Sequence, residues 1–289
     1  MLTTKTKVAL AGLAYRTIAV ARRAVGKDDH AVVRRGGFRW SLDLSEGIDF
    51  SIYLLGGFEK STAATLRRLV KPGEVAFDIG ANVGAHTLGL AGSVGPSGKV
   101  FALEPADFAF AKLQQNLLLN PELASRTHAS QILLADARIS QAPTEVYASW
   151  PLQGTGDVHP KHRGRLVSTT GASVDTLDHF VASRQIQSLS LIKLDVDGHE
   201  LPVLRGGLAV LTKLRPILVM EMSPYVHAEE HNSFRELVEL LKSAGYAIEN
   251  AASRRKLPLE AAELERMIPD GASINVVALP AACPAPVDS

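Results

Sequence analysis

The sequence predicts an α/β fold built on a doubly wound, mostly parallel sheet. Apolar runs of strand length alternate with segments of helical spacing, two successive apolar runs end in an acid, and a glycine-framed turn follows the first of them. Such alternation places parallel strands between two layers of helices. One sheet with an N-terminal appendage can contain all 289 residues without a second core.

The expected elements follow from hydrophobic periodicity. Strands are predicted near 75–79, 99–103, 130–135, 190–195 and 216–221, with helices near 61–70, 107–119, 201–213 and 232–243. Two last strands are expected at 246–249 and 273–279. Residues 138–176 interrupt the alternation with short apolar runs at 146–150 and 166–169. We expect a long segment of this kind, between regular elements, to cover the substrate site.

The first 26 residues have the pattern of a basic amphipathic helix. Lysines and arginines interrupt its apolar positions, and Arg16 breaks what could have been the core of a signal peptide. The segment is too short and too charged to span a bilayer. It either packs on its own domain or contacts a membrane surface or a partner. We expect an N-terminal helix with lead-in strands at 1–50, the main domain at 51–280 and a disordered Pro- and Ala-rich tail at 281–289.

Composition limits the classes of partner. The net charge is +1, with 31 basic and 30 acidic residues, so no overall field favours a nucleic-acid partner. The single cysteine, Cys283, can form no internal disulfide and supports no cysteine-based zinc site. We therefore expect a cytoplasmic protein, with membrane association through residues 1–26 left open. The sequence does not predict the oligomeric state.

The glycine-framed turn has the features of a nucleotide-cofactor loop. Gly80 and Gly84 let the backbone fold tightly after the strand that contains Asp78. A dinucleotide fingerprint needs glycine where Asn82 stands, which argues against a nicotinamide-dependent oxidoreductase. Asp78, expected at the mouth of the loop, suits a ligand that carries an ammonium group, and Glu104 at the end of the next apolar run can bind both hydroxyls of a ribose. S-adenosylmethionine has both of these groups.

The order of these motifs resembles a known family. Phe77 to Gly84, Val100 to Pro105 and Leu113 to Asn120 look like class I S-adenosylmethionine-dependent methyltransferases, and Leu191 to Gly207 with Arg215 to Glu221 resembles the FkbM family in particular. The resemblance covers roughly residues 50–280. It implies a Rossmann-like sheet of seven strands with an antiparallel edge hairpin, and a methyltransferase that uses S-adenosylmethionine. By this resemblance Asp136 reaches the adenine amino group. Asp197 departs from the family pattern, which usually has glutamate there.

Candidate catalytic residues follow the fourth predicted strand. Lys193, Asp195 and Asp197 should point to one side, and His199 and Glu200 should open the next helix. Ligands of parallel sheets bind at this edge, so Asp195 is expected near Gly80. A helix start favours a neutral imidazole, which can accept a hydroxyl proton, and Asp195 competes with His199 for that role.

The remaining candidates have alternative structural roles. Asp197, Glu200 and Glu221 are predicted to line the acceptor site, although Glu200 equally suits a helix N-terminus and Glu221 a loop cap. Lys193 equally suits an ion pair with Asp195. We expect a small-molecule or glycan acceptor whose hydroxyl oxygen is methylated. A cofactor-binding module without catalysis is the alternative from another class.

No metal ligand is predicted. The acids after the fourth strand are hard oxygen ligands, so magnesium remains a less favoured alternative. The spacing of Asp195, Asp197 and Glu200 falls short of a calcium-loop pattern. His227, His159 and His162 show no ligand spacing and are expected at the surface.

Overall fold

The computed structural model describes residues 4–152, 158–159, 164–229, 231 and 233–281, with the side chains of residues 4–9 left aside. The tail predicted to be disordered lies outside the described residues from position 282 onward, and so does His162.

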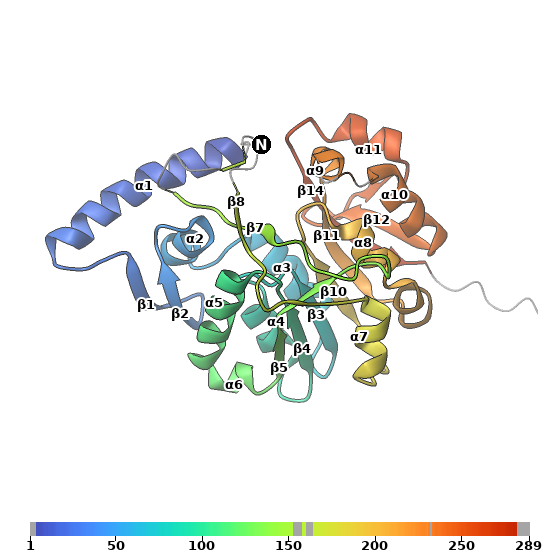
Figure 1. The fold of residues 1–289 in the computed structure, drawn as a ribbon, viewed down its shortest axis with the longest axis horizontal. Helices are drawn as coiled ribbons and strands as arrows, with labels where there is room; N and C mark the ends of the chain where they lie inside the picture. Colours follow the sequence, from blue (N-terminus) through green and yellow to red (C-terminus); the bar gives the residue numbers. More distant parts are fainter. Residues whose placement is uncertain (1–3, 153–157, 160–163, 230, 232, 282–289) are drawn as a thin grey trace, which may run out of the picture.

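A twisted, mostly parallel sheet forms the centre of the molecule (Figure 1). In the described residues its strand order is β13-β12-β14-β11-β10-β3-β4-β5. The strands are β3 (Val75–Ile79), β4 (Lys99–Leu103), β5 (Thr127–Ser130), β10 (Leu191–Leu194), β11 (Ile217–Met222), β12 (Tyr246–Asn250), β13 (Lys256–Leu257) and β14 (Ile274–Pro280). The five strands from β5 to β11 run parallel, and β14 and β12 form the antiparallel edge. The predicted fold class is confirmed, and the short β13 adds an eighth strand.

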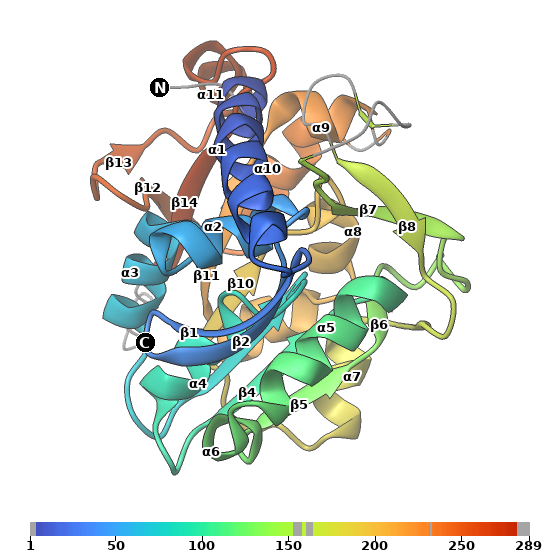
Figure 2. The ribbon, with the colours of Figure 1, turned by 90° about the vertical axis from the view of Figure 1, so that its left-hand side faces the viewer.

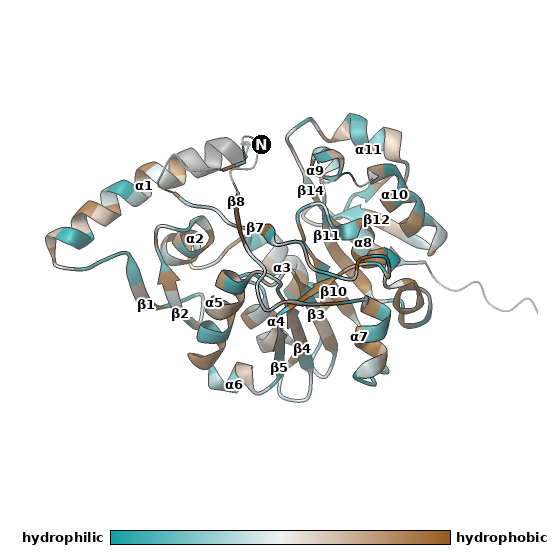
Figure 3. Cartoon of the chain, viewed as in Figure 1, coloured by the Kyte–Doolittle hydropathy of each residue, from teal (hydrophilic) through white to brown (hydrophobic). Residues whose placement is uncertain are grey.

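Helices cover both faces of this sheet, because alternate strand residues point to opposite sides. Phe77 and Phe101 share a hydrophobic cluster with α7, α8 and α10, whereas Ala76 and Val100 pack against α3 and α4. Brown, hydrophobic strands occupy the centre of Figure 3. The helices are α3 (Lys60–Leu69), α4 (Thr87–Val94), α5 (Asp107–Leu118), α6 (Pro121–Ala124), α7 (Leu177–Ser183), α8 (Glu200–Arg205), α9 (Pro224–Glu229), α10 (Phe234–Ser243) and α11 (Ala261–Met267).

Two predicted elements are divided in the structure. The helix expected over 201–213 ends at Arg205, and a π-helical turn follows at Val210–Leu214. A β-carbon at Gly206 would lie 2.2 Å from the carbonyl oxygen of Ala135, so the chain passes very close to the neighbouring segment there. The strand expected at 130–135 splits into β5 and β6 (Ile132–Leu134), and β6 pairs with β9 (Ser173–Asp175) outside the main sheet.

The N-terminal segment packs on the main domain. It consists of α1 (Thr4–Ala24), the hairpin β1 (His30–Arg35) and β2 (Phe38–Asp43), and α2 (Gly47–Leu55). The rings of Tyr15 and Phe50 meet edge to face at 5.8 Å, and their cluster includes Val83 of the loop after β3. The expected boundary between residues 50 and 51 falls inside α2. In the part of the chain that the structure describes, no helix is long and apolar enough to cross a membrane.

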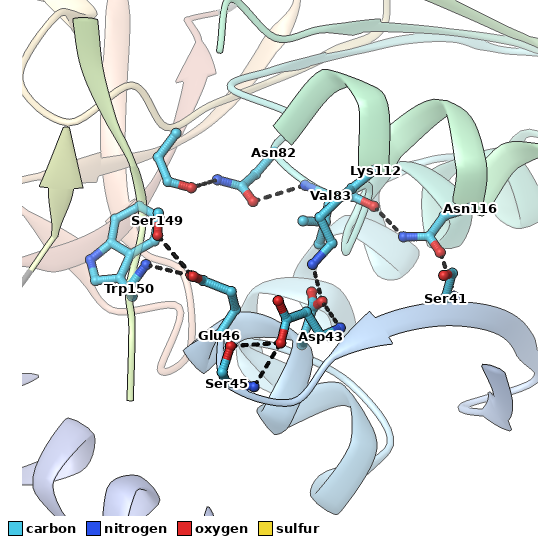
Figure 4. Close-up of polar contacts among 12 residues, drawn as sticks. Ser41, Asp43, Ser45, Glu46, Asn82, Val83, Lys112, Asn116, Ser149 and Trp150 are labelled. Atoms are coloured by element: carbon cyan, nitrogen blue, oxygen red, sulfur yellow. Dashed lines mark hydrogen bonds and ion pairs between the residues drawn. The ribbon is translucent and has the colours of Figure 1, made fainter. Parts of the chain in front are cut away.

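The long excursion forms a hairpin of β7 (Glu145–Ser149) and β8 (Arg165–Ser168). Glu46, just before α2, holds this hairpin: its carboxylate accepts hydrogen bonds from the Ser149 hydroxyl at 2.9 Å and from the Trp150 N–H at 3.1 Å (Figure 4). Arg165 donates to the same carboxylate at 3.3 Å. Figure 2 shows the hairpin at the edge of the molecule beyond α5. The excursion is therefore fixed to the N-terminal segment.

Candidate active site

The loop after β3 is constrained at both glycines. Gly80 and Gly84 have φ of 75° and 89°, a region that side chains disfavour. A β-carbon at Gly80 would lie 1.9 Å from the carbonyl oxygen of Asp195, and one at Gly84 would lie 2.9 Å from Leu113 Cδ1. The loop therefore lies directly against the end of β10. Asp195 lies next to Gly80, as predicted.

Asn82 fixes the middle of this loop. Its φ is 47°, which asparagine tolerates better than most residues. The side-chain Oδ1 accepts the N–H of Val83 at 2.9 Å, and Nδ2 donates to the carbonyl of Ala148 in β7 at 3.1 Å (Figure 4). The asparagine thus connects the loop to the hairpin of the long excursion.

The carboxyl group of Glu104 lies beneath the same loop. It accepts the backbone N–H groups of Asn82 at 2.8 Å and of Ala106 at 2.9 Å. Burial raises the pKa of Glu104 to about 7, although these two N–H groups oppose the rise. Each carboxyl oxygen can accept a second hydrogen bond. An acid held under a glycine loop at the neighbouring strand end fits the recognition of ribose hydroxyls.

Asp78 lies deeper than the loop mouth where it was expected. The residue is fully buried, and its carboxylate accepts a hydrogen bond from the Thr87 hydroxyl at 2.6 Å. The Lys193 ammonium lies 3.3 Å from its other oxygen. The expectation that the Asp78 carboxylate lies at the loop mouth was wrong, because both of its oxygens face interior partners. A contact between Asp78 and the ammonium group of a cofactor stays a prediction.

Asp136 borders a cavity. Arg138 donates to both of its carboxylate oxygens, with the shortest contact at 2.5 Å, and these bonds hold the pKa of Asp136 below its usual range. The cavity has a volume of about 340 Å³ and is lined by Asp136, Ala137, Arg138 and Arg205. It lies at the end of β6, and the contact of Asp136 with adenine stays a prediction.

Lys193 connects the loop after β3 with the end of β10. Its ammonium donates to the carbonyl of Gly80 at 2.7 Å and lies 3.6 Å from Asp195 as well as 3.3 Å from Asp78. Burial disfavours its charge, but the two carboxylates outweigh burial and raise the pKa of Lys193 above its ordinary value. The ion pair considered for Lys193 and Asp195 is therefore present and includes Asp78.

Acidic side chains gather at the ends of β10 and β11. Burial raises the pKa of Asp195, and burial with the charges of Asp195, Glu221 and Glu200 raises that of Asp197 well above its usual range. The pKa of Glu200 rises to about 7 and that of Glu221 to about 8, both mainly through burial. These mutual effects show that the four carboxyl groups lie within electrostatic range of one another, and their role in an acceptor site stays a prediction. Among the residues that the structure describes, no three His, Cys, Asp or Glu side chains form a metal-binding group.

Two of these acids also make local structural contacts. Glu200 accepts the Val196 N–H at 3.2 Å, in keeping with the alternative role at the start of α8. Glu221 accepts a hydrogen bond from the Ser273 hydroxyl of the segment that leads into β14. Asp197 lies in a turn at φ 46° beyond the end of β10, so the extended strand predicted through this residue is shorter in the structure.

Glu59 and His86 lie near these acids, although no sequence pattern predicted them. Glu59 precedes α3 with φ 40°, its Oε2 accepts the Thr62 hydroxyl at 3.1 Å, and it lies 3.8 Å from His86 Nε2. Burial raises the pKa of Glu59, but the contacts with His86 and Thr62 bring it below its ordinary value. Its charge acts on both Asp195 and Glu221. No motif spacing marks residue 59, because the long-range fold alone brings it to the strand ends.

His227 was wrongly predicted to lie at the surface. It is only 1% exposed in α9, which begins at Pro224, and its Nε2 lies 3.2 Å from Glu200 Oε2. Burial lowers the pKa of His227 to about 4, so the contact joins a neutral imidazole to the carboxyl group. The charge of His199 also acts on His227.

The structure also describes His199 and His159. His199 occupies the N-cap position of the six-residue α8, at the helix start where it was expected, but its side chain makes no capping hydrogen bond. The side chain of His159, also expected at the surface, is mostly covered and lies 3.4 Å from Glu229.

The chain belongs to the FkbM methyltransferase family. The model of the methyltransferase FkbM domain matches residues 78–248, which are more than half of the chain and include the ends of β3, β4, β6, β10 and β11 but not Glu59. The family consists of methyltransferases that use S-adenosylmethionine. The motif resemblance is thereby confirmed.

Curated relatives are distant. The hexuronic acid methyltransferase AglP of Haloferax volcanii is 28% identical over 149 residues, which are 50% of this chain and 55% of that protein. The 2-O-methyltransferase NoeI of Sinorhizobium fredii is 30% identical over 183 residues, 61% of this chain and 74% of that protein. The chain thus spans about half the length of the first relative. A solved FkbM methyltransferase of Methylobacillus flagellatus has 17% identity and a TM-score of 0.42, covering 75% of this chain and 50% of that one.

Proposed function

We propose that this protein transfers a methyl group from S-adenosylmethionine to a hydroxyl oxygen of a sugar, glycan or secondary metabolite. The observation that carries the proposal is the contact between Gly80 and Asp195, because it joins the cofactor loop directly to the carboxyl cluster. The family supplies the reaction class, and the names of the two relatives support a sugar hydroxyl as the acceptor.

The donor half of the site uses the ends of β3, β4 and β6. In the proposal, Glu104 holds the ribose hydroxyls, Asp136 takes the adenine amino group, and Gly80, Asn82 and Gly84 allow close approach of the backbone. The buried Glu104 carboxyl beneath the loop and the cavity beside Asp136 fit this ligand. S-adenosylmethionine supplies an electrophilic methyl group on a sulfonium.

The acceptor half uses the ends of β10 and β11. Three carboxyl groups, those of Asp197, Glu200 and Glu221, can bind acceptor hydroxyls. Each accepts hydrogen bonds from hydroxyls when it is ionised and can also donate one when it is protonated. Methyl transfer requires that the acceptor be aligned and its proton removed as charge develops. Asp195 and His199 are the candidate bases, and the raised pKa of Asp195 makes its carboxylate a stronger proton acceptor. Lys193 holds Asp195 in place next to the loop.

An isotope experiment tests the acceptor class. The enzyme is incubated with S-adenosylmethionine carrying a labelled methyl group and with a panel of glycosides, and products are analysed by mass spectrometry. We expect one labelled methyl ether on a sugar hydroxyl. Labelling of a nitrogen or carbon atom would contradict the proposal. Binding of S-adenosylmethionine without turnover, on every glycoside and in cell extract, would also contradict it and would favour the non-catalytic alternative.

Two variants separate the candidate bases. Loss of the base should lower turnover ~10²–10⁴-fold while cofactor affinity stays nearly intact. Full activity of His199→Ala would exclude His199 as the base and leave Asp195 as the candidate. Full activity of Asp195→Asn would exclude Asp195 and leave His199. If a chelator abolishes turnover and magnesium restores it, the mechanism requires a metal ion and the metal-free version is wrong. The nicotinamide alternative is superseded by the family assignment.

A further inference from the structure

Helix α1 covers the outside of the molecule with only one of its faces packed (Figures 1 and 2). Tyr15 and Ala19 are buried on the inner face. Leu10, Leu13 and Val20 lie on the opposite face and are 56%, 66% and 67% exposed. Their spacing places them along one helical stripe, which the exposed Thr17 interrupts between Leu13 and Val20, and we call this stripe the outer face.

The charges of α1 all have one sign. Its sequence contains Lys5, Lys7, Arg16, Arg22 and Arg23 and no acidic residue. Arg16 and Arg23 are both exposed, and seven residues separate them, so they lie along the same border of the outer face. Figure 3 shows hydrophobic and hydrophilic segments alternating along this helix. An apolar strip beside a basic row is the pattern of helices that lie in the plane of a membrane interface.

We infer that the outer face of α1 docks on an anionic lipid surface. The helix lies parallel to the surface, with Leu13 and Val20 at the boundary between headgroups and acyl chains and Arg16 and Arg23 beside anionic headgroups. The inference rests on α1 and is independent of the proposed methyl acceptor.

Charge favours a membrane over a second copy of the chain. In a symmetric pair of α1 helices the same basic row would face itself, because a two-fold interface uses the same patch on both subunits. Three exposed aliphatic side chains are also far fewer than the residues that a stable protein interface buries. The net charge of the whole chain is only +1, so a cationic attraction has to come from a local group such as α1.

Vesicle flotation tests this inference. The full chain is mixed with vesicles of phosphatidylcholine alone or with added phosphatidylglycerol, at low and high salt. We expect flotation with the anionic vesicles that weakens as salt increases. Arg16→Gln combined with Arg23→Gln should lower the partition constant for the anionic vesicles ~10–30-fold, because each basic residue near an anionic surface contributes separately.

Matched variants exclude a general effect of surface charge. Leu13→Asp with Val20→Asp should abolish flotation, whereas Leu118→Asp should keep it, because Leu118 is 80% exposed at the end of α5. Circular dichroism of each variant checks folding. No flotation of the wild type with anionic vesicles would overturn the inference, as would a Leu13→Asp, Val20→Asp variant that floats normally. A dimer that these two substitutions dissociate, without vesicle binding, would identify a second copy as the occupant.

Discussion

The carbonyl oxygen of Asp195 occupies the space where a β-carbon of residue 80 would lie. The separation would be only 1.9 Å, so glycine is the one residue that lets the loop after β3 meet the end of β10. Lys193 reinforces the same junction by donating to the carbonyl of Gly80 at 2.7 Å. The loop after β3 and the end of β10 are thereby held together.

Gly80→Ala should damage both stability and cofactor binding. The new methyl group would overlap the Asp195 carbonyl and force a positive φ on alanine, at a cost of about 2–4 kcal/mol. Gly89→Ala is the control, because Gly89 lies inside α4 with open space around it, and alanine there should stabilise by up to about 1 kcal/mol. Denaturant unfolding and calorimetry measure the two effects. A Gly80→Ala protein as stable as the wild type would contradict the packing described.

Glu46→Ala should loosen the β7–β8 hairpin. Removing the carboxylate leaves the Ser149 hydroxyl, the Trp150 N–H and Arg165 without their shared acceptor, a loss of about 1–3 kcal/mol. Hydrogen exchange at residues 145–152 should therefore accelerate. Glu122→Ala is the control, since the Glu122 side chain is 85% exposed in its pair with Arg126 and should contribute little. Unchanged exchange in the Glu46 variant would mean that other contacts hold the hairpin.

Burial of Glu200 should make stability depend on pH. Its folded pKa of about 7 exceeds the ordinary value of 4.5, so the folded state binds more protons than the unfolded state between these values. The free energy of unfolding should then fall as pH rises through this window, by about 3 kcal/mol for this group. Glu200→Gln should reduce the slope, which Glu104 shares, while the exposed Glu265→Gln should not. A slope that Glu200→Gln leaves unaltered would show that this carboxyl group is not the one that titrates.

Periodicity was sufficient to predict the frame of the fold. The predicted bounds of β3 and β4 agree with the structure because buried parallel strands are short apolar runs bounded by turns. The approach of Asp195 to Gly80 was also predictable, because parallel strands bring their carboxyl ends to one edge. Those inferences depend on local sequence and on a general rule of topology.

Contacts between distant segments could not be predicted in the same way. The burial of His227 depends on α9 folding back over Glu200, and the place of Glu59 depends on the start of α3 meeting the end of β10. Asp78 was predicted at the loop mouth because it lies at the end of the strand before the glycine-framed turn, but its carboxylate faces Lys193 on the neighbouring strand. Side-chain partners of this kind are set by tertiary packing, which a single sequence does not display.

Calorimetric titration with S-adenosylmethionine tests the central claim most directly, because the proposed site uses Glu104 as the ribose ligand. We expect the wild type to bind, and to bind more tightly at about pH 8 than at about pH 6, as the carboxyl group with a pKa of about 7 ionises. Glu104→Gln should bind ~1–3 kcal/mol more weakly and lose this pH dependence. A wild-type protein that does not bind S-adenosylmethionine, or a Glu104→Gln variant with unchanged affinity, would contradict the site described here.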